Sequence, residues 1–152
     1  MKVLGIDPGS AKSGWVALGI GNAGMRVSDH DYCPNEALLH MLRAMTEGDY
    51  QGVGVEWIQS QGRKHVGNET FDTQGWAGRF LEAAYPVPAA PIPRRKVIGH
   101  LVGSYGGDAQ VIQVLQAKPG LGCGTVTGHC WQALAVAVTF VEVVAVQGVA
   151  TP

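Results

Sequence analysis

The chain has 152 residues, a formal net charge of −1, 46% hydrophobic residues and 15% charged residues. This composition is typical of a globular protein and excludes a disordered chain, and the length suits a single domain over residues 1–152. The near-neutral charge argues against a protein that binds nucleic acid through its net charge alone.

The first half of the sequence predicts four strands and one helix. Gly21-Asn22-Ala23-Gly24 is a hairpin signal, so the strands on either side of it should pair antiparallel. Pro34 is suited to the start of the helix, where its missing N–H costs nothing. In chain order the elements are strands at residues 3–7, 14–20 and 25–32, a helix from 34 to about 45, and a strand at 52–57.

The second half predicts mainly helices. The proline-rich residues 85–93 fit an edge strand better than a helix or a central strand. The predicted helices cover residues 68 or 70 to about 84, 94–101, 109–117 and 131–146, with a glycine-rich loop at 118–128 before the last one. The whole pattern predicts an α/β protein with a mixed sheet and helices packed against it.

No segment of the sequence is typical of export or of a membrane span. The opening residues MKVLGIDPGS contain too few consecutive apolar residues for a signal-peptide core. The longest apolar stretch, residues 133–146, contains Thr139 and Glu142 and falls short of the ~20 residues that a span needs. Three cysteines without paired spacing indicate a reducing compartment. We therefore predict a cytoplasmic protein without a membrane segment.

Charge is distributed unevenly along the chain. Residues 1–60 carry four basic and seven acidic side chains, whereas residues 61–118 carry seven basic and four acidic ones. An acidic first half beside a basic middle suits a carboxylate site bordered by a phosphate-binding surface, although ordinary surface scatter explains the counts equally well.

Asp7 and Glu56 are the central candidate residues. Each lies near the carboxyl end of an apolar strand, where a charge is costly unless it is paired or bound to a cation. Two such strands side by side would direct both carboxylates at one site. Mg²⁺ prefers such hard oxygen ligands, and a pair of ions could promote phosphodiester cleavage. A turn-forming aspartate and a solvent-facing strand-end acid are the plainer alternatives.

His129 stands where the last helix begins. Facing the carboxylates, it would be a metal ligand or a proton-transfer group, although a histidine near a helix start is more often a surface or capping residue. Cys123, His129 and Cys130 also suggest zinc, but they lack the usual paired ligand spacing.

Several motifs resemble those of RuvC-type resolvases, which cut four-way (Holliday) DNA junctions. V-L-G-I-D-P-G-S at residues 3–10 and S-G-W at 13–15 are similar to the opening strand of that family. V-G-V-E at 53–56 is similar to its second acidic strand, and A-L-A-V-A at 133–137 to the start of its last helix.

A subgroup of RuvC-like proteins often found in bacteriophages is similar over longer stretches. The similar stretches are residues 71–80, 95–115 and 118–139. Together with the shorter motifs they cover most of the chain in the family's order.

The resemblance implies a ribonuclease H-like fold and a homodimer that holds Mg²⁺ or Mn²⁺, with two ions per site, and nicks two opposite strands of branched DNA in a bacterial or phage-infected cell. Asp7 matches the family's first catalytic acid, Glu56 its second, and His129 a position held by aspartate or histidine. Gln132 departs from the family, because it stands where typical members carry the last catalytic aspartate. Asp108 is the candidate to replace that acid, and a helix cap is an equally good interpretation of it.

DNA contacts should be made mainly to phosphates. The basic candidates are Arg63, Lys64, Arg79, Arg94, Arg95 and Lys96. Trp57 could stack at an opened junction, although a core position is the more common role of such a tryptophan.

The sequence leaves three other functions to compare with junction cleavage. Because Gln132 is neutral, the chain could bind junctions with weak cleavage or none. A nucleotide-binding domain of the actin or sugar-kinase type would need a second lobe, for which 152 residues leave no room. A dinucleotide-binding fold is disfavoured, because the glycine pattern at 19–24 leads into a strand rather than a helix.

Overall fold

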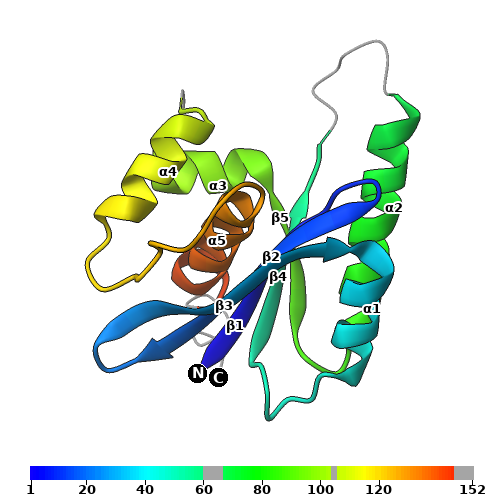
Figure 1. Cartoon of the computed structure of the whole chain (residues 1–152), viewed down its shortest axis with the longest axis horizontal. Helices are drawn as coiled ribbons and strands as arrows, with labels where there is room; N and C mark the ends of the chain where they lie inside the picture. Colours follow the sequence, from blue (N-terminus) through cyan, green and yellow to red (C-terminus); the bar gives the residue numbers. More distant parts are fainter. Residues whose placement is uncertain (60–66, 104–105, 146–152) are drawn as a thin grey trace.

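The computed structural model describes residues 1–59, 67–103 and 106–145, and Figure 1 shows how their helices and strands are arranged. Five strands form one sheet in the order β3-β2-β1-β4-β5. They are β1 (Lys2–Asp7), β2 (Lys12–Gly21), β3 (Gly24–Pro34), β4 (Gly52–Trp57) and β5 (Ala89–Pro93). The pairs β1–β2 and β2–β3 are antiparallel, whereas β1–β4 and β4–β5 are parallel. The mixed sheet predicted from the sequence is therefore confirmed, with β5 at an edge.

Helices cover both faces of the sheet. In Figure 1, α1 and α2 lie on one face, and α3, α4 and α5 lie on the other. The helices are α1 (Asn35–Ala44), α2 (Asn68–Ala83), α3 (Arg94–Leu101), α4 (Asp108–Ala117) and α5 (Cys130–Thr139), which continues into the π-helix η1 (Phe140–Ala145). Among the described residues, no helix is long and apolar enough to cross a bilayer.

The central strand β1 contributes to both apolar cores. Val3 packs into the core beneath α5, whereas Leu4 and Ile6 belong to the core beneath α1 and α2. The alternation follows from the two-residue period of a strand. Because both of its faces are covered, β1 is a nearly continuous apolar run up to Asp7.

Glycines allow α5 to lie very close to the sheet. A Cβ atom on Gly5 of β1 would collide with the backbone of Ala133 and with Ala137 on α5, and one on Gly14 of β2 would come within 2.9 Å of the His129 carbonyl group. These two contacts hold the start of α5, with the side chains it carries, directly against the carboxyl end of β1.

The last helix differs from the prediction. The apolar pattern predicts one α-helix to residue 146, but the chain changes to a π-helix at Phe140. This wider turn contains Glu142, whose carboxylate binds His100 Nε2 at 2.7 Å and Lys118 Nζ at 2.8 Å. Helical periodicity and propensity do not distinguish such a turn from an α-helix.

Candidate active site

Asp7 and Glu56 lie side by side at the carboxyl edge of the sheet. The parallel pairing of Ile6 with Val55 makes them the next residues along β1 and β4. Both are buried, with 9% and 5% of their surface exposed. Residues at the ends of adjacent parallel strands meet at one edge of a sheet, so the sequence prediction that brings these two acids together is geometrically correct.

The two carboxylates affect each other strongly. Burial, followed by the charge of Glu56 and a hydrogen bond with it, raises the pKa of Asp7 from 3.8 to about 8, although Arg94 acts in the opposite direction. Near neutral pH the pair therefore retains a proton when no other cation is present. A divalent cation would relieve the same repulsion.

The turn after Asp7 is held by two buried polar side chains. The Gly9 N–H donates to Ser13 Oγ at 3.1 Å, and Asn35 Nδ2 donates to the Gly9 carbonyl at 2.9 Å. Ser13 in turn donates to Asn35 Oδ1 at 2.6 Å. Sequence reasoning missed this support. Ser13 could have indicated it, because it is a polar residue at the start of an otherwise apolar strand.

Arg94, the first residue of α3, points into the site. Its Nη1 donates to Glu56 Oε1 at 2.7 Å and to Gln132 Oε1 at 3.4 Å, while Nη2 binds Asp108. Burial opposes the positive charge, but Glu56 and Asp108 outweigh it and hold the pKa of Arg94 above its ordinary value. The sequence predicts that Arg94 contacts DNA; the structure places it among the acids, and the DNA contact stays a prediction.

His129 approaches Asp7 from the start of α5. Its Nδ1 lies 3.3 Å from Asp7 Oδ2, and 62% of its side chain is exposed. Tyr32 of β3 stacks on the imidazole with the ring centres 4.8 Å apart and the planes 15° from parallel. The Lys12 ammonium lies 5.7 Å from the centre of the Tyr32 ring. The stacking fixes the plane of the imidazole beside the acid pair, a contact that sequence reasoning missed.

Asp108 and Gln132 both reach the site through Arg94. Asp108 is the first residue of α4, and Gly107 rather than Asp108 is the N-cap. Its side chain is 58% exposed and pairs with the guanidinium. Asp108 therefore contributes charge near Glu56, and its role as a catalytic acid stays a prediction.

The donor set fits a hard divalent cation held by few protein ligands. Two adjacent carboxylates that retain a proton when no cation is bound suit Mg²⁺ or Mn²⁺, which retain several waters and share the substrate's phosphate. Within the described ranges, no group of three or more His, Cys, Asp or Glu side chains is assembled as a ready-made metal site. Cys130 Sγ donates to the Asp31 carbonyl and Cys123 Sγ to the Leu115 carbonyl, which gives no support to zinc.

The remaining basic candidates lie outside the acid cluster. Arg95 and Lys96 are exposed on the first turn of α3, next to Arg94. Arg63 and Lys64 fall outside the described residues. Trp57 is half-buried and packs against the core beneath α1 and α2, as its plainer interpretation predicts.

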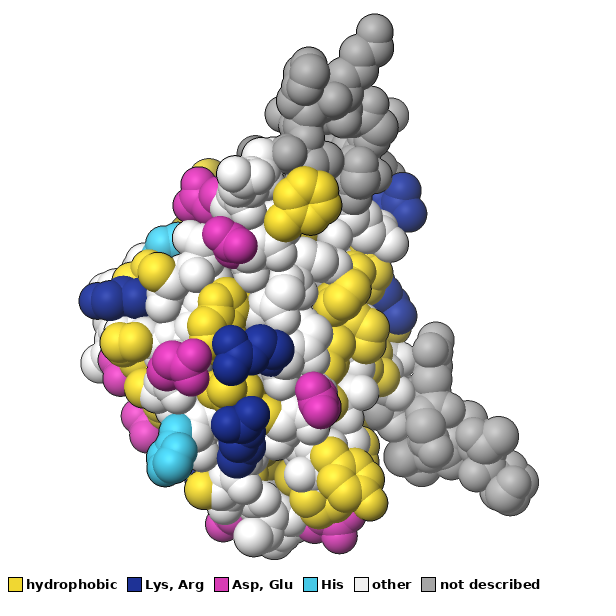
Figure 2. Space-filling view, turned by 90° about the vertical axis from the view of Figure 1, so that its right-hand side faces the viewer, with side chains coloured by type: hydrophobic (Ala, Val, Ile, Leu, Met, Phe, Trp, Pro, Cys, Tyr) yellow, Lys and Arg dark blue, Asp and Glu magenta, His cyan; other side chains and the backbone are white. Residues whose placement is uncertain are grey.

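Arg79 lies on a different face, on α2. It pairs with Glu36 of α1 at 3.6 Å and stacks over the Trp76 ring at 4.0 Å. Figure 2 shows the right-hand side of the molecule as drawn in Figure 1, where α1 and α2 lie. There, basic side chains are interspersed with acidic and hydrophobic ones. The DNA role of Arg79 stays a prediction, and the contacts described for its guanidinium are with side chains of α1 and α2.

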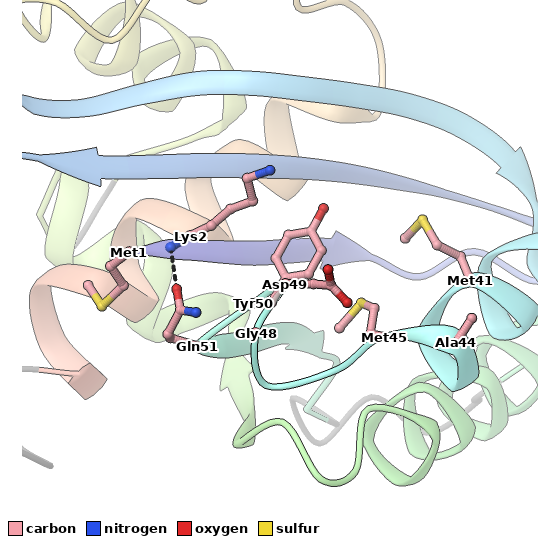
Figure 3. A pocket seen from close by; sticks show the side chains of 9 residues that line it. All are labelled: Met1, Lys2, Met41, Ala44, Met45, Gly48, Asp49, Tyr50 and Gln51. Carbon is pink, nitrogen blue, oxygen red and sulfur yellow. Dashed lines mark hydrogen bonds between the residues drawn. The ribbon is translucent and has the colours of Figure 1, made fainter.

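A large hollow lies at the other end of the sheet (Figure 3). It is an open cavity of about 790 Å³, lined by residues that include Met1, Lys2, Met45 and Gln51. These residues flank the amino ends of β1 and β4, whereas the acid pair lies at their carboxyl ends. At about 3.3 Å per residue the two places are some 15 Å apart along β1. The hollow is thus separate from the acid pair.

The five-stranded mixed sheet with helices on both faces is a ribonuclease H-like fold, as the resemblance to RuvC-type resolvases implies. The chain is similar to RuvC of Thermus thermophilus, with a TM-score of 0.74 and 21% identity over 97% of both chains. It is also similar to T. thermophilus RuvC in complex with a Holliday junction substrate, with a TM-score of 0.75 and 24% identity over 100% of this chain and 99% of that one.

A viral resolvase shares the fold at lower identity. The fowlpox virus resolvase, in complex with substrate Holliday junction DNA, aligns with a TM-score of 0.59 and 13% identity over 95% of this chain and 99% of its own. No protein-family model and no curated protein sequence matches the chain. At these identities the likeness establishes the RuvC-type fold, and the similarity to the bacteriophage subgroup stays a prediction.

Proposed function

We propose that this protein is a metal-dependent, structure-selective endodeoxyribonuclease that resolves Holliday junctions or other branched DNA by paired symmetric nicks. The observation that carries the proposal is the buried pair Asp7 and Glu56 at the carboxyl edge of β1 and β4. The fold supports it, because proteins with this fold have been solved with Holliday junctions bound.

Asp7 and Glu56, with His129 beside them, would hold Mg²⁺ or Mn²⁺, which supplies a polarised water and neutralises phosphate charge. The pair of ions expected from the sequence meets an obstacle at Glu56, since Arg94 already binds one of its oxygens.

The chain's own residues have separable roles in this reaction. His129, exposed beside Asp7, is placed to move a proton to or from the reacting phosphodiester. Arg94 carries a fixed positive charge next to Glu56, where negative charge would develop on the phosphate. Arg95 and Lys96 are exposed on the same turn and would bind neighbouring phosphates, which position the strand without reading its sequence.

Paired nicks require two active sites. The described part of one chain carries a single acid pair, so we propose a homodimer in which each copy cuts one of two symmetry-related strands. We also propose that the protein acts in the cytoplasm of a bacterial or phage-infected cell, where such DNA is found and where its three free cysteines stay reduced.

The second candidate function is junction binding with weak cleavage or none. The observation that favours it is Gln132, a neutral residue that contacts Arg94 in the place of an acid. Such a protein would bind junctions in a salt-sensitive way without metal-dependent nicks.

The decisive experiment compares a labelled synthetic four-way junction with a matched linear duplex in Mg²⁺, Mn²⁺ or EDTA. We expect symmetric nicks in the junction only, in either metal and not in EDTA. Asp7→Asn should abolish the nicks, whereas Asp72→Asn, which removes an exposed acid on α2, should not. Binding without nicks would favour the second candidate, and neither binding nor nicks would contradict both.

A further inference from the structure

Five side chains form a row across the site. His129 contacts Asp7, Asp7 contacts Glu56, Glu56 contacts Arg94, and Arg94 contacts Asp108. The row contains two distinct places for a positive charge. The first, between Asp7 and Glu56, has two carboxylates facing each other. The second, on the far side of Glu56, is filled by the guanidinium of Arg94.

The second place is a complete arginine site. The guanidinium makes hydrogen bonds to Glu56 Oε1, to Gln132 Oε1 and to Asp108, and 34% of the side chain is exposed. A metal ion there would have to take the same Glu56 oxygen and displace a charge-assisted bond, which is among the stronger hydrogen bonds in proteins. Gln132 offers such an ion only a neutral oxygen.

The charges of the five side chains also argue against a second metal ion. Asp7, Glu56 and Asp108 carry three negative charges when ionised, and Arg94 carries one positive charge. A single divalent cation brings this group to neutrality. A second one would leave an excess of two positive charges before any DNA phosphate arrives, and Arg94 would repel it at close range.

We propose that the site takes one divalent ion, between Asp7 and Glu56, and that the guanidinium of Arg94 stands in the place of a second ion. This inference rests on the proposed nuclease function for its meaning, but not for its test. The proposal also explains the neutral residue at position 132. Gln132 accepts a hydrogen bond from Arg94, whereas an acid at this position would attract a second metal ion. Arg94, Gln132 and Asp108 then act as a unit that replaces one metal and its ligand.

The test counts Mn²⁺ bound to the full-length protein without DNA, by titration calorimetry and by electron paramagnetic resonance. The resonance spectrum separates isolated ions from a magnetically coupled pair. We expect one isolated Mn²⁺ per chain in the unmodified protein. The double variant Arg94→Met, Gln132→Asp should bind two, as a coupled pair, because it removes the guanidinium and supplies an acid.

Two single variants complete the set. Gln132→Asp alone should still bind one ion, because Arg94 remains and gains a stronger partner. Arg43→Met removes an exposed arginine from the last turn of α1 and should also bind one ion. Two ions or none in the unmodified protein would overturn the proposal, even if the double variant fails to fold. One ion in a folded double variant would also overturn it.

The number of bound Mn²⁺ ions and the nuclease activity are tested independently. One bound ion without nicks would contradict the proposed function and leave the place of Arg94 intact. Junction-specific nicks with two bound ions would do the reverse.

Discussion

The shared proton of the acid pair makes the stability of the metal-free protein depend on pH. The pKa of Asp7 is raised to about 8 in the folded state, so the folded chain holds this proton more tightly than the unfolded chain does. The corresponding stability is fully present below pH 3.8 and is lost as the pH rises toward 8. Asp7→Asn removes this titration, and we expect the variant to become more stable than the unmodified protein as the pH rises.

The structure sets an upper bound on that difference. Each pH unit between 3.8 and about 8 is worth about 1.4 kcal/mol, which gives about 6 kcal/mol at most. That pKa already includes the opposing effect of Arg94, but Asp7→Asn also removes the carboxylate that lies 3.3 Å from His129 Nδ1, which offsets part of the gain. We therefore expect about 2 kcal/mol at pH 8, or about 4–8 °C in the melting temperature of a chain of this length.

The assay is thermal unfolding followed by circular dichroism from pH 4 to pH 8.5 in EDTA, with Asp72→Asn as the matched control on an exposed site. At pH 8, adding Mn²⁺ should raise the melting temperature of the unmodified protein and have little effect on Asp7→Asn. Parallel pH profiles for the unmodified protein and Asp7→Asn would refute the reasoning, because they would mean that the two carboxylates do not share a proton.

Three further substitutions test other parts of the fold and site. Gly5→Ala should destabilise the protein by about 3 kcal/mol in urea unfolding, because the new Cβ meets the backbone of α5; an unchanged midpoint would contradict that close contact. Glu142→Gln should lower the free energy of unfolding by about 1 kcal/mol at pH 7 and have no effect well below pH 4.5, because hydrogen bonds from Lys118 and His100 outweigh burial and hold the pKa of this carboxyl below 4.5. A loss of stability that is the same at every pH would exclude this cause. Tyr32→Leu should lower the rate of junction cleavage at saturating substrate about threefold to tenfold with little change in KM, because the imidazole of His129 loses the ring that stacks on it. Equal rates for the variant and the unmodified protein would show that Tyr32 does not position His129.

The sequence predicts the sheet and the acid pair because both depend on local patterns. An apolar run that ends in an acid identifies β1 with Asp7 and β4 with Glu56, and turn signals set the order of the strands. These patterns reflect burial on both faces of the strand, and burial can be inferred from the residue types.

The surroundings of the acid pair could not be predicted, because they depend on which distant elements meet. Nothing in the sequence near Arg94 distinguishes an arginine that faces Glu56 from its neighbours Arg95 and Lys96, which face outward. The orientation is set where β5 ends and α3 begins, and by the acid on α4 that binds the other side of the guanidinium. Tyr32 was missed for the same reason, since its partner His129 lies 97 positions further along the chain.

The order of the elements along the chain has a consequence for biosynthesis. The two acids come from strands that are neighbours in the sheet but are separated in the chain by β2, β3 and α1. The helix α5, which follows His129, is made after all five strands, and it packs on β1, the first of them. A nascent chain on the ribosome therefore holds Asp7 and Glu56 long before it can assemble the rest of the site, and pairing over such sequence separations is slow. A protein that cuts DNA would in this way stay inert until α5 has been made.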